Sequence, residues 1–88
     1  MIIGKVVNKI VSTRKHDQLN GFKLLVIEPC FGQQQASFVA ADELGAGEGE
    51  IVMVTTGSAA QHGIRTTAPI DAVVVGIVDD PAAISIAY

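Results

Sequence analysis

The residues that could carry metal or redox chemistry in this chain are few and widely separated. His16 and His62 lie far apart, and neither has a second His or Cys at the spacing of a metal site. Cys30 is the single cysteine, so it can form neither an intrachain disulfide nor a multi-cysteine metal site, and a buried structural thiol is the expected role. We therefore expect no bound metal and no organic cofactor.

The carboxylates and the one candidate nucleophile do not form a catalytic pattern either. Asp42 and Glu43 are adjacent and are typical of a solvated helix start, and Glu48 and Glu50 flank a glycine and are predicted to face water. Ser58 follows a glycine but lacks the Gly-x-Ser-x-Gly frame of a nucleophile elbow. The sequence predicts no catalytic residue, and hence a protein that is not an enzyme.

Residues 45–49, Gly-Ala-Gly-Glu-Gly, superficially resemble a phosphate-binding loop. They lack the Lys-Ser/Thr ending of a P-loop, and no helix of useful length follows them. A tight connection between two strands is the better interpretation.

Composition indicates a protein that binds other protein chains. Of 88 residues, 49% are hydrophobic and 17% are charged, against a usual charged fraction of about 25%. A domain of this size has a thin core, so part of the apolar surplus is expected at an interface. The net charge of -3 and the small number of aromatic residues (3 Phe, 1 Tyr, no Trp) argue against a nucleic-acid partner.

A membrane role is not expected. The longest apolar runs, such as residues 72–78, are much shorter than the roughly 18 residues of a membrane span. The N-terminus enters an apolar strand without the basic and hydrophobic regions of a signal peptide. A cytoplasmic location is therefore predicted.

Hydrophobic patterning predicts an all-β fold. Runs rich in Ile and Val, separated by turn residues, are typical of a small barrel, and Pro29 is expected to end the second strand or place it at an edge. Residues 42–44 and 57–63 could each form one helical turn, and residues 84–86 a short final strand. The five expected strands are residues 2–12, 22–27, 37–41, 51–56 and 70–78.

Two of these strands are apolar on both faces, in residues 51–54 and 72–75. An antiparallel strand with one face in water normally alternates apolar and polar residues. The outer face therefore needs a cover, and since the chain has no sizeable helix, another subunit is the expected one.

Several short motifs in order along the chain resemble the EutN/CcmL family of bacterial microcompartment vertex proteins. The most informative of them is Ala-Ala-Asp followed by Gly-Ala-Gly, in residues 40–47. The others are Val-Ser-Thr at 11–13, Lys-Leu-Leu-Val at 23–26, Gly-Ser-Ala-Ala at 57–60, Pro-Ile-Asp at 69–71 and Val-Gly-Ile-Val-Asp at 75–79.

The resemblance implies a small five-stranded OB-like barrel, in residues 1–81, followed by a short tail, 82–88. It implies a structural shell protein that forms a homopentamer, caps the vertices of a polyhedral shell and contacts hexameric shell proteins. Gly57, Ser58, Ala59 and Ala60 match the family's pore-lining segment, and Gln61 stands where members commonly carry Arg. The alternative is a free OB-like module that binds nucleic acid or oligosaccharide, and a small enzyme or regulatory subunit is less consistent still with the residues.

Overall fold

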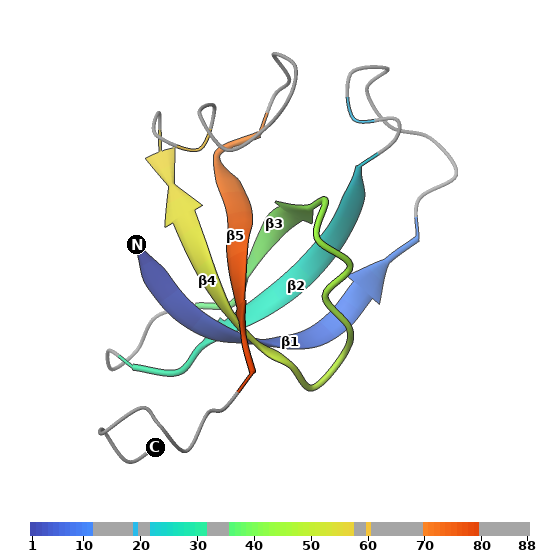
Figure 1. The fold of residues 1–88 in the computed structure, drawn as a ribbon. Coiled ribbons are helices and arrows are strands. Elements are labelled where there is room, and N and C mark those ends of the chain that lie inside the picture. Colours follow the sequence, from blue (N-terminus) through green and yellow to red (C-terminus); the bar gives the residue numbers. More distant parts are fainter. Residues whose placement is uncertain (12–18, 20–21, 32–35, 58–59, 61–69, 80–88) are drawn as a thin grey trace.

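Five strands close into one barrel in the computed structural model, which describes residues 1–11, 19, 22–31, 36–57, 60 and 70–79 (Figure 1). The strands run in the order β1-β2-β3-β5-β4, and β4 closes the barrel by pairing with β1. The strands are β1 (Ile2–Ile10), β2 (Lys23–Pro29), β3 (Phe38–Asp42), β4 (Ile51–Thr56) and β5 (Ala72–Val78).

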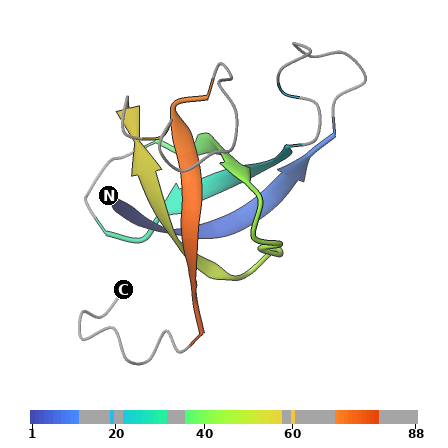
Figure 2. The same cartoon turned by 45° about the horizontal axis from the view of Figure 1, so that its top comes forward.

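All neighbouring strands are antiparallel except β3 and β5, which are parallel and joined at the single pair Ala41 and Val73. Figure 2 shows β1 and β2 running side by side across the barrel, as their long antiparallel register requires. The closed five-stranded barrel confirms the predicted fold class.

Two apolar clusters stabilise this arrangement. The first fills the barrel with alternating residues of all five strands, among them Val6, Leu25 and Val52. Gly4 belongs to this tight region, because a Cβ there would meet the Ile27 side chain and lie 3.1 Å from the Glu28 carbonyl oxygen. A side chain at position 4 would therefore overpack the core.

The second cluster lies on the outside of the barrel, over β3 and β5. Phe22, Ala60 and Ile70 pack there against Ala41 and Val73. The outer face of β5 that the sequence predicts to need another subunit is thus covered, at Val73, by the chain's own residues.

The strand ends differ slightly from prediction. Val11 lies beyond β1 and is exposed, and Phe22 and Ile70 lie just before β2 and β5, where they pack in the second cluster. Pro29 is the last residue of β2, as expected for a residue without a backbone N–H.

The helical turn predicted at 42–44 is wrong, since Asp42 ends β3 and the chain then bends. Gly57 and Ala60 belong to 3₁₀-type turns, which agrees with a short turn after β4. The rest of that turn, the tail at 82–88 and the strand expected at 84–86 lie outside the described residues. Within the described part, no helix has the length and apolar character needed to cross a membrane.

Candidate assembly surfaces

Asp42 is a buried anchor of the loop between β3 and β4, and the prediction of a solvated carboxylate there is wrong. Its Oδ1 accepts the backbone N–H of Leu44 at 2.9 Å, and its Oδ2 accepts that of Ala46 at 2.8 Å. The Lys23 Nζ lies 4.0 Å from Oδ2 and also donates to the Ala46 carbonyl oxygen. The carboxylate therefore fixes the start of the loop in place of a helical turn.

The glycine-rich loop that follows uses its backbone N–H groups within the protein. Gly47 donates to the Glu50 Oε1 at 2.7 Å, Gly49 to the Val6 carbonyl at 2.8 Å, and Glu50 to the Gly47 carbonyl at 3.1 Å. Because these donors are already bonded, the loop is a strand connection rather than a phosphate cradle, as predicted. Glu48 and Glu50 are exposed, also as predicted.

The remaining candidate chemical groups form no site among the described residues. Cys30 is half-buried, less than expected for a core thiol. Burial raises the pKa of the Cys30 thiol, Glu28 raises it further, and Lys5 opposes them. His16 and His62 lie outside the described residues, and the part of the chain that is described holds no group of three potential metal ligands.

An exposed apolar surface lies on the outside of β4 and its two neighbours. Ile3 on β1 and Gly76 on β5 are directly opposite Met53, so the three share one face. The register shift beside Met53 makes Val75 the extra residue of a β-bulge, where its side chain is 39% exposed. We call Ile3, Met53, Val75 and Gly76 the β4 surface.

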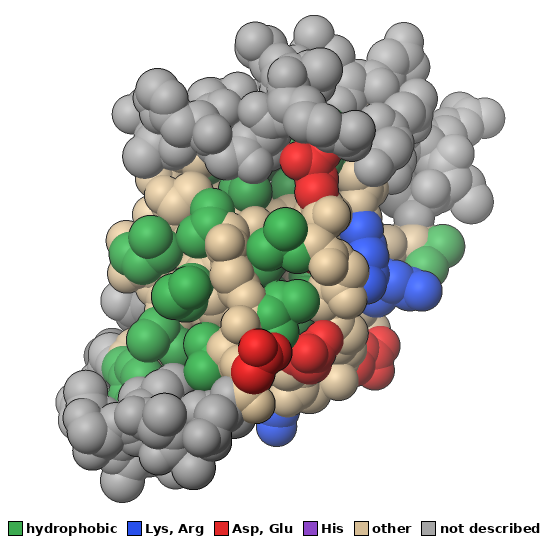
Figure 3. All heavy atoms as spheres, viewed as in Figure 1, with side chains coloured by type: hydrophobic (Ala, Val, Ile, Leu, Met, Phe, Trp, Pro, Cys, Tyr) green, Lys and Arg blue, Asp and Glu red, His purple; other side chains and the backbone are tan. Residues whose placement is uncertain are grey.

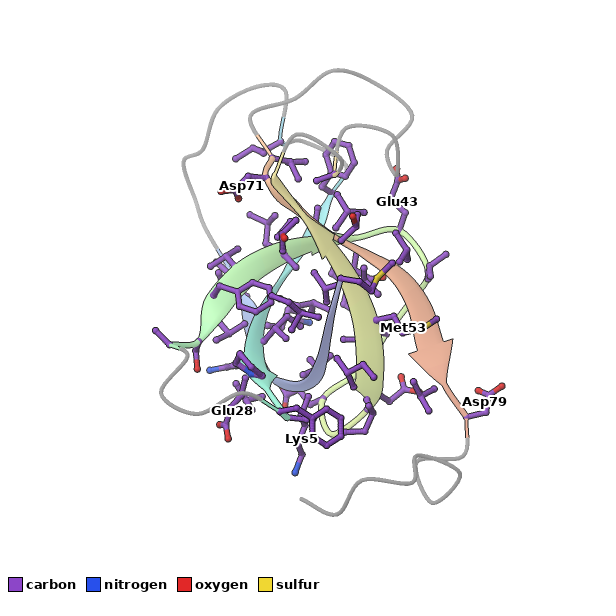
Figure 4. The ribbon with its side chains drawn as sticks, turned by 90° about the vertical axis from the view of Figure 1, so that its left-hand side faces the viewer. Lys5, Glu28, Glu43, Met53, Asp71 and Asp79 are labelled. Atoms are coloured by element: carbon purple, nitrogen blue, oxygen red, sulfur yellow. The ribbon has the colours of Figure 1, made fainter. Side chains whose placement is uncertain are left out.

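The β4 surface is apolar and adaptable. Figure 3 shows hydrophobic side chains gathered over β4 and β5, with acidic side chains along the lower edge of this face and lysines to the right. Met53 is 38% exposed, and its methyl group lies where a Cβ of Gly76 would be. In Figure 4, Asp71 lies near one end of the barrel, and Lys5 and Glu28 lie near the other end. Met53 lies between the two ends.

A second apolar surface lies over the junction of β3 and β5, where the ladder between neighbouring strands is shortest. A hollow of about 180 Å³ opens beside the second cluster, and exposed Asp71 is among the residues that line it. Val39 is 45% exposed there. The described residues around it, which we call the β3 hollow, are Leu19, Leu24, Val39, Ala41, Ile70, Asp71 and Ala72.

The segment predicted to line a pore is attached directly to this hollow. Gly57 donates its N–H to the Asp71 carbonyl oxygen at 2.8 Å. Its φ of 69° is a left-handed conformation that favours glycine. Ala60 is fully buried in the second cluster, so its side chain faces the protein, while Ser58 and Ala59 lie outside the described residues.

Comparison with known proteins places these surfaces in context. The family model described as "Ethanolamine utilisation protein EutN/carboxysome" matches residues 1–79. The solved GrpN pentameric microcompartment shell protein from Rhodospirillum rubrum is 43% identical to the chain. The alignment covers 91% of this chain and 95% of GrpN, with a TM-score of 0.79.

Two further relatives agree with that match. The carboxysome shell vertex protein CcmL of Thermosynechococcus vestitus is 45% identical over 90% of this chain and 84% of its own length. The structure of the ethanolamine utilization protein EutN from Escherichia coli is 36% identical, with a TM-score of 0.78. That match covers 90% of this chain and 88% of EutN.

Proposed function

The chain belongs to the EutN/CcmL family, and from this premise we propose that it is a shell vertex protein of a bacterial microcompartment. It is a structural protein and not an enzyme, it forms a homopentamer, and it resides in the microcompartment shell within the cytoplasm. We assign residues 1–81 to the shell barrel and 82–88 to a tail.

The observation that carries this function is the likeness to a pentameric shell protein over almost the whole of both chains. The same likeness favours a shell role over a free nucleic-acid-binding module. The apolar surfaces support it independently, because exposed apolar patches on a small domain usually mark contacts with other protein chains.

We further propose that the outer rim of the pentamer contacts hexameric shell proteins. A flat layer of hexagonal tiles cannot close into a polyhedron, and a fivefold unit at each vertex supplies the missing curvature. The contacts with hexamers must lie away from the contacts that hold the five chains together, so that the ring can form before the shell does.

Native mass spectrometry tests the pentamer. Five chains of 9.2 kDa are expected to give an assembly of about 46 kDa. A hexameric ring would argue against the vertex role, and a monomer at micromolar concentration would remove the basis of the proposed function.

We propose that the segment of Gly57, Ser58, Ala59 and Ala60 borders the ring axis, with the Ala60 side chain packed in the second cluster of its own chain. The left-handed Gly57, held by the Asp71 carbonyl, would present the small residues that follow it to the axis from a fixed starting point. Small residues allow five chains to approach one another closely there.

Substitution of Ser58 tests this placement. Ser58→Ala should leave the pentamer intact, whereas Ser58→Trp should crowd five indoles at the axis and weaken the ring, since overpacking typically costs about 1 to 3 kcal/mol per site. Pentamer dissociation on dilution, followed by native mass spectrometry, measures the difference. Equal dissociation of the two variants would place Ser58 away from the axis.

A further inference from the structure

A closed ring of five identical chains requires each chain to present two different patches, one to each neighbour. The β4 surface and the β3 hollow are two different exposed apolar patches on the described part of the barrel. We propose that the β3 hollow of one chain receives the β4 surface of the next, an inference that rests on the proposed pentamer.

The two patches are centred on different strands of the barrel, one on β4 and one on β3, although residues of β5 belong to both. β4 pairs only with β1 and β5, so in the closed order β1-β2-β3-β5-β4 the strands β2 and β3 lie across the barrel from it. In Figure 1, β4 stands on the left and β2 on the right, with β5 between them in front. Two different patches can propagate around a ring, whereas a single self-complementary patch could only form a dimer.

The two patches are also complementary in shape and chemistry. Apart from Asp71, the described residues that line the hollow are aliphatic, and its volume is about 180 Å³. The β4 surface offers Met53, whose unbranched thioether can adapt to an irregular apolar hollow. The Met53 side chain lies over Gly76, which has no side chain of its own. Met53 can therefore turn toward a neighbouring chain without a steric clash at Gly76.

One polar residue, Asp71, is among the described residues that line the hollow. Asp71 is exposed, and exposed polar residues are typical of the rim of a protein interface. The Asp71 backbone also holds Gly57, so a neighbour seated in the hollow would lie next to the segment proposed to border the ring axis.

Paired cysteines test the contact. In a Cys30→Ser background, a chain carrying both Met53→Cys and Val39→Cys is treated with a short bismaleimide and run on a denaturing gel. We expect a ladder of covalent species up to five chains. Both positions are partly exposed, so the substitutions should leave the fold intact.

Three controls show whether a cross-link requires position 53 of one chain and position 39 of another. Leu44→Cys with Val39→Cys is the matched pair, because Leu44 is exposed but belongs to neither patch, and it should remain monomeric on the gel. Each single variant should also remain monomeric. A reassembled mixture of the two single variants should give covalent dimers and nothing larger.

The outcomes separate this inference from the proposed function. A pentamer by native mass with no ladder from Met53→Cys and Val39→Cys would overturn the assigned contact and leave the pentamer standing. Covalent dimers from Met53→Cys alone would show that β4 surfaces meet each other, which also overturns it. A monomeric Cys30→Ser protein would end the proposed function, and the contact with it.

Discussion

Asp42→Ala is expected to lower the free energy of unfolding by about 3 kcal/mol, because it removes the acceptor of two backbone N–H groups. The Ala46 N–H is buried, and an unsatisfied buried donor costs about 1 to 3 kcal/mol. The ion pair contributes less, since Lys23 is 36% exposed and can still reach water or the Ala46 carbonyl.

Urea denaturation at one fixed chain concentration measures this effect, because assembly contributes to the apparent stability of an oligomer. Asp42→Asn should fall between wild type and alanine, since its amide retains one acceptor oxygen and directs a donor at the other N–H. Asp79→Asn is the matched control at an exposed position and should change stability by less than about 0.5 kcal/mol. Equal stability of Asp42→Ala and Asp79→Asn would show that the loop does not depend on the buried carboxylate.

The role of Asp42 shows what local sequence can and cannot predict. Asp-Glu-Leu reads locally as a helix start, and nothing nearby reveals that Lys23 and the core will enclose the carboxylate. One signal was present. An Asp at a strand end, followed two and three residues later by Leu and Gly, is typical of an Asx-turn, in which the carboxylate accepts the N–H two residues on. The bond from Leu44 has that spacing.

The strands were predictable because their signal is local. Runs of β-branched residues bounded by glycine or proline predicted all five strands, with errors of one or two residues at the described ends. The errors at Phe22 and Ile70 share one cause. Both are apolar residues next to a strand, and both are used in the second cluster outside the barrel rather than in a ladder.

The sequence predicted that an outer face of the barrel is covered, but not which residues form the exposed surfaces. Strands with two apolar faces indicated a covered outer face, and the structure divides that face into two parts. Val73 is covered by the chain's own Phe22, Ala60 and Ile70, whereas Met53 and Val75 remain exposed. Only the closed strand order shows that Met53, on β4, is separated from β3 by β5. The pore-lining assignment of residues 57–60 stays a prediction.

Shell closure is expected to depend on this chain while the formation of hexagonal layers does not. When the hexameric shell proteins are produced without it, we expect open or elongated layers and tubes in place of closed polyhedra, because fivefold vertices are then missing. Electron microscopy of purified particles gives the fraction of closed shells. Adding the chain back in trans should restore closure, whereas a variant that does not form the pentamer should leave the layers open.

That comparison also separates the ring from its contacts with the shell. Met53→Asp places a charge on the β4 surface and should prevent both the pentamer and closure, since a charge buried without a partner at an interface is strongly unfavourable. A charge at exposed Leu44, outside both patches, should leave the pentamer intact; loss of closure in Leu44→Asp would then assign its loop to the rim that meets the hexamers. Regular closed polyhedra formed in the complete absence of this chain and any paralogue would be incompatible with a vertex function.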